Sequence, residues 1–107
     1  MIRHDPRMEA LRQRYADSLA DKRAALVDAW ERWRAANGSP DLLRKLATLA
    51  HRLAGSAGSY GYDDLGACAS ALDRIAAARQ DAPVDHAAVD AAVRALLAAI
   101  DAAQAQR

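Results

Sequence analysis

The chain has 107 residues, enough for one compact domain and too few for two. About half of the residues are apolar (52%), aromatic residues are scarce (5%) and there are 3 prolines, a composition that favours an all-helical protein. The 15 basic and 14 acidic side chains nearly cancel, which argues against a general nucleic-acid binder, and the single cysteine excludes an internal disulfide and a cysteine metal cluster.

The first third of the chain carries one apolar stripe, whose residues recur at spacings of three, four and seven. These residues are Met8, Leu11, Tyr15, Leu19, Leu26, Val27, Trp30 and Trp33. The stripe predicts a helix over about 6–36, long enough for a bend near 18–22. The segment "NGSP" at 37–40 combines a glycine, a cap residue and a proline, and is expected to end this helix.

A second helix is predicted from the apolar pattern that starts at Leu42. We expect it to reach about Tyr60, because Gly61 suits the left-handed position that follows a helix. A glycine inside a helix costs about 1 kcal/mol relative to alanine, so Gly55 and Gly58 require a reason.

Two further helices are predicted. Asp63 or Asp64 can cap the third, which has apolar positions over 65–76 and ends before the loop "QDAPVD" at 80–85. Asp85 is the expected cap of the fourth, which has apolar positions over 89–100 and a fraying end at 102–107. Four stripes joined by short connections predict an antiparallel, up-and-down four-helix bundle with a long or bent first helix.

His51 lies on the second helix, outside its apolar stripe. At about 100° per residue, it falls roughly 140° from the centre of that stripe, so the imidazole is predicted to face solvent. The residues that share its face are all small: Ala47, Thr48, Ala54, Gly55 and Gly58. They either give a partner access to an exposed nucleophilic ring or let another helix pack closely, and Gly55, which points away from the apolar side, favours access.

The segment "AHRLAGSAGSYGYDDLGACASALD" at 50–73 resembles the histidine phosphotransfer (HPt) domains of multistep two-component phosphorelays. The resembling features are His51, the hydrophobic Leu53, the glycine-containing turns, and a helix that opens with an acidic residue and a leucine. This segment is about a quarter of the chain, and the number and length of the predicted helices fit the family over the whole domain.

The resemblance implies that His51 is the phosphoacceptor, through its Nε2 atom. It would receive a phosphoryl group from the aspartyl-phosphate of one receiver domain and pass it to the aspartate of another, so the chain would be a phosphocarrier and not an enzyme. The receiver would bring the aspartate, Mg²⁺ and a lysine, so no cofactor or metal site is expected on this chain. The implied partners are response-regulator receiver domains and a hybrid sensor histidine kinase, and we expect a monomer.

One departure from the family concerns the charge beside the histidine. Many members carry a lysine three residues after it, where this chain has Ala54. Arg52 and Arg44 are candidates to offset the phosphate charge. Arg44 lies on roughly the same helix face two turns earlier, whereas Arg52 is adjacent in sequence and rotated by about 100°. We take Arg52 as the source of part of this electrostatic help.

Other functions stay open at this point. A module that docks a receiver without carrying phosphate is the main alternative, because the lysine is missing. A metal or cofactor site inside a bundle would need inward Glu or His ligands on facing helices, which the pattern does not indicate. His4 and His86 have no partner at a metal-ligand spacing, and Cys68 is expected to be a small core residue.

No apolar run approaches the roughly 20 residues that a membrane span requires, and the start "MIRHDPRMEALRQRY" lacks the apolar core of a signal peptide. The expected compartment is therefore the cytoplasm. We expect residues 1–107 to form a single domain with a mobile segment at 1–5, and the initial methionine favours a free-standing protein.

Overall fold

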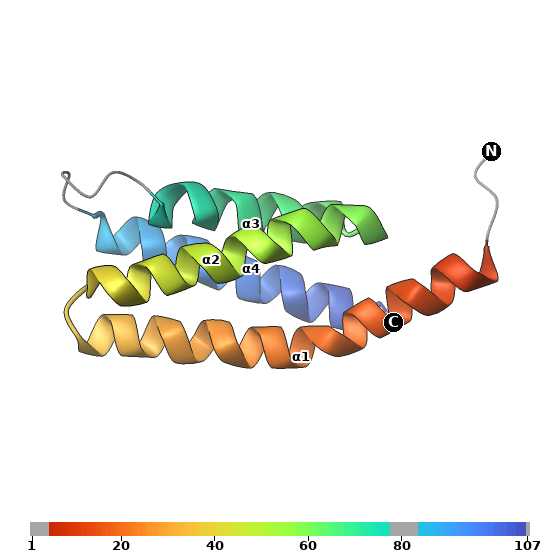
Figure 1. Ribbon diagram of the computed structural model, residues 1–107, viewed down its shortest axis with the longest axis horizontal. Helices are drawn as coiled ribbons and strands as arrows, with labels where there is room; N and C mark the ends of the chain where they lie inside the picture. Colours follow the sequence, from red (N-terminus) through yellow and green to blue (C-terminus); the bar gives the residue numbers. More distant parts are fainter. Residues whose placement is uncertain (1–4, 78–83, 107) are drawn as a thin grey trace.

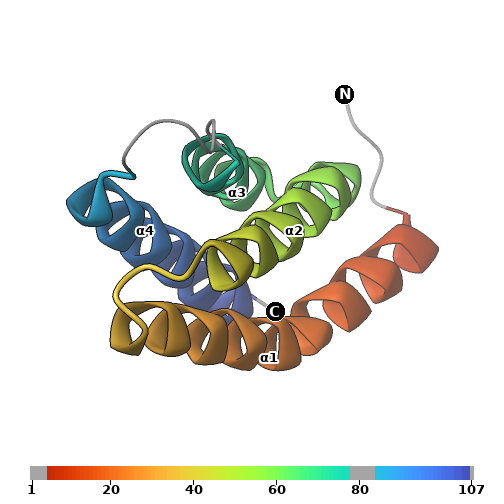
Figure 2. The same ribbon diagram turned by 60° about the vertical axis from the view of Figure 1, so that its left-hand side comes forward.

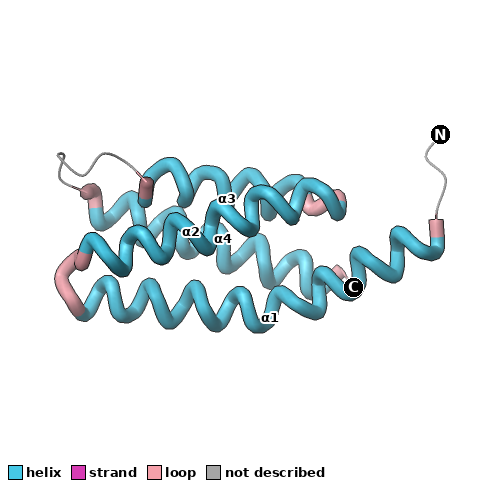
Figure 3. The backbone as a smooth tube through the Cα atoms, viewed as in Figure 1, coloured by secondary structure: helices cyan, strands magenta, loops and turns pink. Residues whose placement is uncertain are grey.

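The computed structural model describes residues 5–77 and 84–106, and nearly all of these residues lie in four α-helices and one short 3₁₀ turn. Helix α1 is Pro6–Ala35, α2 is Pro40–Ala57, η1 is Gly58–Tyr60, α3 is Asp63–Ala76 and α4 is His86–Ala105. Figure 3 shows that this described part contains helices and loops only. Helix α1 packs against α2 and α4, and α3 packs against the same two helices, so the predicted helical bundle is confirmed (Figure 1).

Helix α1 begins where the sequence predicts, because the side chain of Asp5 accepts a hydrogen bond from the backbone N–H of Arg7 (2.9 Å). It is 30 residues long, and its N-terminal part extends beyond the end of the other helices (Figures 1 and 2). Met8 and Leu11 lie on this extension and are 46% and 43% exposed. The apolar stripe of α1 therefore enters the core only from Tyr15 onward, later than the sequence pattern indicates.

Helix α2 ends at Ala57, three residues before the predicted end at Tyr60. It changes to a 3₁₀ turn at Gly58, and Gly61 follows with φ +82°, the left-handed conformation expected of it. The backbone N–H of Gly61 donates to the carbonyl of Gly58 (3.1 Å), which closes the turn. The end of this segment thus fixes where α3 begins.

The starts of α3 and α4 differ from each other in their caps. Tyr62 stands at the N-cap of α3 without a side-chain hydrogen bond, so the prediction that Asp63 or Asp64 caps this helix is wrong. Both carboxylates lie instead in the first turn, where the helix dipole favours negative charge. Asp85 caps α4 as predicted, since its side chain accepts from the N–H of Ala88 (3.2 Å).

The first and last helices include residues that lie close to the two ends of the described part. Helix α4 continues to Ala105, and the burial of Ala103 explains why the helix persists through most of the stretch predicted to fray. Asp5, which falls in the predicted mobile segment, caps α1. Residues 1–4, 78–83 and 107 lie outside the described part, and with them most of the predicted loop at 80–85.

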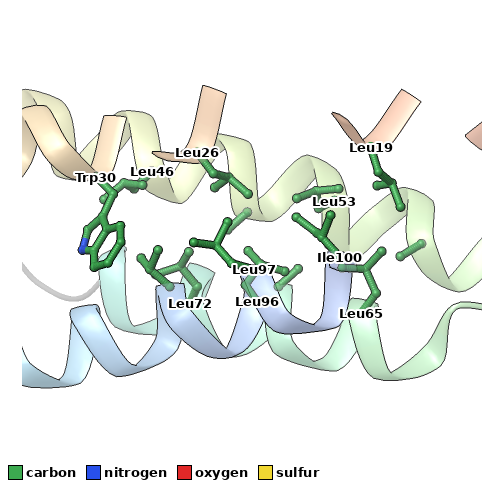
Figure 4. Packing of buried hydrophobic residues seen from close by; sticks show 14 of the residues in the cluster. Leu19, Leu26, Trp30, Leu46, Leu53, Leu65, Leu72, Leu96, Leu97 and Ile100 are labelled. Carbon is green, nitrogen blue, oxygen red and sulfur yellow. The ribbon is translucent and has the colours of Figure 1, made fainter. Parts of the chain in front are cut away.

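The core runs along the middle of the bundle and is built from leucines, isoleucine, valines and the two tryptophans (Figure 4). Trp30 and Trp33 are 7% and 1% exposed, so their predicted place in the core is confirmed. The indole Nε1–H of Trp30 donates to a carboxylate oxygen of Asp90 on α4 (2.7 Å), which satisfies this polar group at the edge of the core. Cys68 is partly buried and packs against the same cluster.

Small residues bring α2 and α3 close together. A Cβ atom added to Gly66 of α3 would lie 3.7 Å from the backbone nitrogen of Gly58, 3.8 Å from the Cβ of Ala57 and 3.9 Å from the carbonyl oxygen of Ala54. These are ordinary van der Waals distances, so one added carbon atom would fill the space between the two helices at this point. The backbone of α3 at Gly66 therefore lies within one side-chain atom of the end of α2, a contact that the sequence pattern did not single out.

An aromatic cluster packs α1 against the end of α2. The hydroxyl oxygens of Tyr15 and Ser56 are 2.7 Å apart, and the Tyr15 ring stacks on that of Tyr60 with centroids 4.7 Å apart. The Nε–H of Arg12 donates to the carbonyl oxygen of Tyr60 (2.7 Å). Burial raises the pKa of the Tyr15 hydroxyl, as expected for a group that must stay neutral inside the cluster.

The packing of α2 on α3 makes a direct prediction for Gly66. Replacement by leucine should lower the free energy of unfolding by about 1–3 kcal/mol, because the longer side chain forces the helices apart. Replacement by alanine should keep or raise the stability, by up to about 1 kcal/mol, because its Cβ fits and alanine favours helix. Urea unfolding followed by circular dichroism measures both, and equal stability of the two variants would contradict the close packing.

Candidate functional site

The His51 side chain lies on the surface of α2 and is 79% exposed, as its position on the helix predicts. Leu46, Ala50 and Leu53, which surround it in sequence, are buried in the core. The helical period therefore separates the apolar residues, which fix α2 in the bundle, from the imidazole, which is left to solvent. A rigid buried element thus carries an exposed titratable ring.

The orientation of the His51 ring is fixed by Asp73 of α3. The Nδ1 atom lies 2.9 Å from Oδ2 of Asp73. An ionised carboxylate only accepts hydrogen bonds, so this contact fits the tautomer of the ring that has its proton on Nδ1 and donates a hydrogen bond to Asp73. The other ring nitrogen, Nε2, then bears the lone pair, and the described part of the chain offers it no hydrogen bond. Of the two ring nitrogens, Nε2 is therefore the one without a hydrogen-bond partner among the described residues.

Asp73 is the hydrogen-bond partner of His51 that sequence reasoning missed. Its side chain is 26% exposed, and it lies at the last position of the segment that carries the family resemblance. A signal for it does exist in the sequence, because His51 precedes Tyr62 by as many residues as Asp73 follows it. In an antiparallel helix pair that turns at Tyr62, two such residues come opposite one another.

The small residues predicted to surround His51 fall into two groups. Ala47 and Ala54 are partly buried and pack against the core, so close helix packing explains them. Thr48, Gly55 and Gly58 are exposed, and a Cβ added to either glycine would meet no atom within 4 Å. The side-chain positions of these two glycines are therefore open to solvent and are not filled by a neighbouring helix.

The two arginines proposed to assist His51 differ in their surroundings. Arg44 forms an ion pair with Asp41, one turn nearer to the start of α2, so its guanidinium is engaged away from His51. Arg52 is exposed and makes no ion pair with any residue that the structure describes. It lines a groove between α1 and α2, across from Lys22. Of the two arginines, Arg52 is the one without a carboxylate partner among the described residues.

Metal-ligating residues do not gather elsewhere in the described ranges. No group of three or more His, Cys, Asp or Glu side chains is placed to hold a metal ion within 5–77 and 84–106. His86 lies at the start of α4, where its ring packs on that of Trp33 with centroids 4.7 Å apart. His4 falls outside the described residues. The His51–Asp73 pair is thus the chemically distinctive site of the described chain.

Comparison with known proteins decides the family. The protein-family model described as the Hpt domain matches residues 10–106, which is most of the chain. The chain belongs to the Hpt family. A search of curated proteins and a search of solved structures each found no match to it. Hpt domains are helical bundles that act as histidine phosphotransfer modules in phosphorelays, where they interact with response-regulator receivers and carry the phosphoryl group.

In this Hpt domain, no helix of the described residues is long and apolar enough to cross a bilayer. The match spans all four helices, so it includes both His51 and Asp73. The resemblance found in the segment 50–73 therefore extends over the bundle.

Substitutions of Gly55 in this Hpt domain should have opposite effects on stability and on the access of a partner to His51. Because an added side chain meets no atom, Gly55→Ala and Gly55→Leu should each raise the free energy of unfolding by about 0.5–1 kcal/mol through helix propensity. Leucine, one turn from His51, should nevertheless slow phosphoryl transfer about tenfold or more by misplacing the partner. Thermal unfolding and transfer assays measure the two effects.

The matched control is Gly38→Ala. At Gly38 the backbone φ is +87° and an added Cβ would lie 2.8 Å from the His86 ring, so this substitution should destabilise the fold. A Gly55→Leu protein that is stable and transfers phosphate at the native rate would refute the access role of Gly55.

Proposed function

We propose that the chain relays a phosphoryl group between the aspartates of receiver domains through Nε2 of His51. The observation that carries this proposal is the exposed His51 ring, whose Nδ1 is held by Asp73 and whose Nε2 is left outward. An acceptor histidine must meet an aspartyl-phosphate on another protein, and a buried or freely rotating ring would do this poorly.

The transfer step follows from the protonation of the ring. The Nε2 lone pair attacks the phosphorus of the aspartyl-phosphate, the N–P bond forms, and the P–O bond to the aspartate breaks and leaves a carboxylate. Because Nδ1 keeps its proton, the phosphorylated imidazole carries a positive charge, which the Asp73 carboxylate offsets across the 2.9 Å hydrogen bond. Transfer to the next receiver is the same step in reverse. Asp73 is thus a positioning residue that also stabilises the charged ring.

Charge on the phosphoryl oxygens requires cations from both proteins. In this proposal the receiver supplies Mg²⁺ and a lysine, and this chain holds no metal or cofactor of its own. Arg52 supplies part of the charge that the family's common lysine would give, since Ala54 stands at that position and Arg44 is paired with Asp41. The upstream partner is a hybrid sensor histidine kinase, and the carrier works as a monomer in the cytoplasm.

The test of this proposal is phosphoryl transfer from a phosphorylated receiver domain, with the native chain compared with His51→Gln. Glutamine is polar and His51 is exposed, so the variant should fold while losing all transfer. The native protein should acquire a phosphate that is labile in acid and stable in alkali. Label that persists in His51→Gln would overturn the assignment of His51.

A second result would favour the alternative function. The absence of the common lysine leaves open a module that docks receivers without carrying phosphate. If several receivers bind the native chain and none labels it, docking alone is its function.

A further inference from the structure

The partner of the His51 ring is a charged group and not a neutral one. Oδ2 of Asp73 lies 2.9 Å from Nδ1, and no other carboxylate of the described residues pairs with the ring. The one acidic residue of α2, Asp41, pairs with Arg44. The Asp73 side chain is 26% exposed, so water screens its negative charge less than it would at a fully exposed position.

The charged side chains that follow this pair in sequence are cations. Arg52 follows His51 on α2, and Arg74 follows Asp73 on α3. From α1, Lys22 lines a groove together with Arg52. Within the described ranges α4 packs on α1 and α3 and not on α2. Positive charge nearby opposes a further positive charge on the ring, so among the chain's own groups it is Asp73 that favours a protonated ring.

The release of a phosphoryl group from His51 depends on the Nδ1 proton. When the aspartate of a receiver attacks the phosphorus, the P–Nε2 bond breaks and its electron pair returns to the ring. A ring that carries the Nδ1 proton leaves as neutral imidazole, whereas a ring without this proton leaves as an imidazolate anion, which is a much poorer leaving group. Uptake has no such requirement, because there Nε2 attacks with its lone pair.

We infer that the charge of Asp73 keeps phosphorylated His51 able to give up its phosphoryl group at neutral and alkaline pH, because the carboxylate holds the proton on Nδ1 after phosphorylation. The inference rests on the proposed function and names the step of it that this charge controls. An opposite charge in direct contact extends the pH range of a protonated group by about one to three pH units. The His51 side chain is 79% exposed, so the effect is at the lower end, about one pH unit.

Two substitutions of Asp73 separate its charge from its hydrogen bond. Asp73→Asn keeps an oxygen that can accept from Nδ1 and removes the charge, whereas Asp73→Ala removes both. If the charge keeps the phosphorylated ring protonated, both variants lose the effect. If Asp73 only orients the ring, Asp73→Asn behaves like the native chain.

The test is the pH dependence of phosphate loss from the chain alone, after phosphorylation with phosphoramidate. Water then replaces the receiver aspartate as the attacking group, and phosphorus-31 NMR follows the inorganic phosphate that is released. The rate should fall on the alkaline side in every protein, and in both Asp73 variants the fall should begin about one pH unit lower than in the native chain. At pH values above both midpoints, the variants should therefore release phosphate about tenfold more slowly.

The matched control is Asp64→Asn, which removes the same unit of charge from an exposed position in the first turn of α3. Its pH profile should equal the native one, and circular dichroism checks that all variants fold. A profile of Asp73→Asn that coincides with the native profile would overturn the inference, whether or not Asp73→Ala differs.

Transfer from the phosphorylated chain to an unphosphorylated receiver distinguishes this inference from the proposed function. If the receiver takes phosphate from the native chain and from Asp73→Asn with the same pH profile, the proposed function stands and the inference fails. If the chain alone follows the predicted profiles but exchanges phosphate with no receiver, the charge effect of Asp73 stands and the relay function fails.

Discussion

The hydrogen bond between His51 and Asp73 links two helices that bind the core through their other faces, and it forms only because α2 and α3 pack closely. The two helices are so close at Gly66 that a Cβ atom added there would already be in van der Waals contact with Ala54 and Gly58. Asp73 then reaches Nδ1 at 2.9 Å, a contact that favours the ring orientation and the tautomer in which Nδ1 donates to the carboxylate. The chemistry of the exposed nitrogen is therefore set by packing that lies beneath it.

The small residues around His51 serve two different physical purposes. Ala54 and Gly66 allow two backbones to approach, and larger side chains there would act on stability. Gly55 and Gly58 are open to solvent. They lower the helix propensity of this segment and allow no closer packing, so we attribute them to the access that a partner protein needs to this surface. A functional surface built this way is less stable than the same helix with alanines, which is a common cost of binding sites.

Much of this arrangement could be predicted from local rules. The helical period places His51 in solvent and the tryptophans in the core, and backbone conformation accounts for Gly61 and the cap at Asp85. The features that could not be predicted depend on partners that are distant in sequence or on competing contacts. The contact of Asp73 with His51 depends on the register of α2 against α3, and Arg44 forms an ion pair with Asp41. Met8 and Leu11 are exposed because α1 extends beyond the ends of the neighbouring helices. A helical wheel contains none of this information.

The central claim is that Asp73 holds the proton on Nδ1 and so makes Nε2 the phosphorylated atom. Nitrogen-15 NMR of the histidine-labelled chain, recorded before and after reaction with phosphoramidate, tests it most directly. We predict that the neutral ring of His51 carries its proton on Nδ1, that phosphorus attaches to Nε2, and that Asp73→Ala shifts the proton distribution between the two nitrogens. Phosphate on Nδ1, or a proton distribution that is the same in Asp73→Ala, would contradict the account.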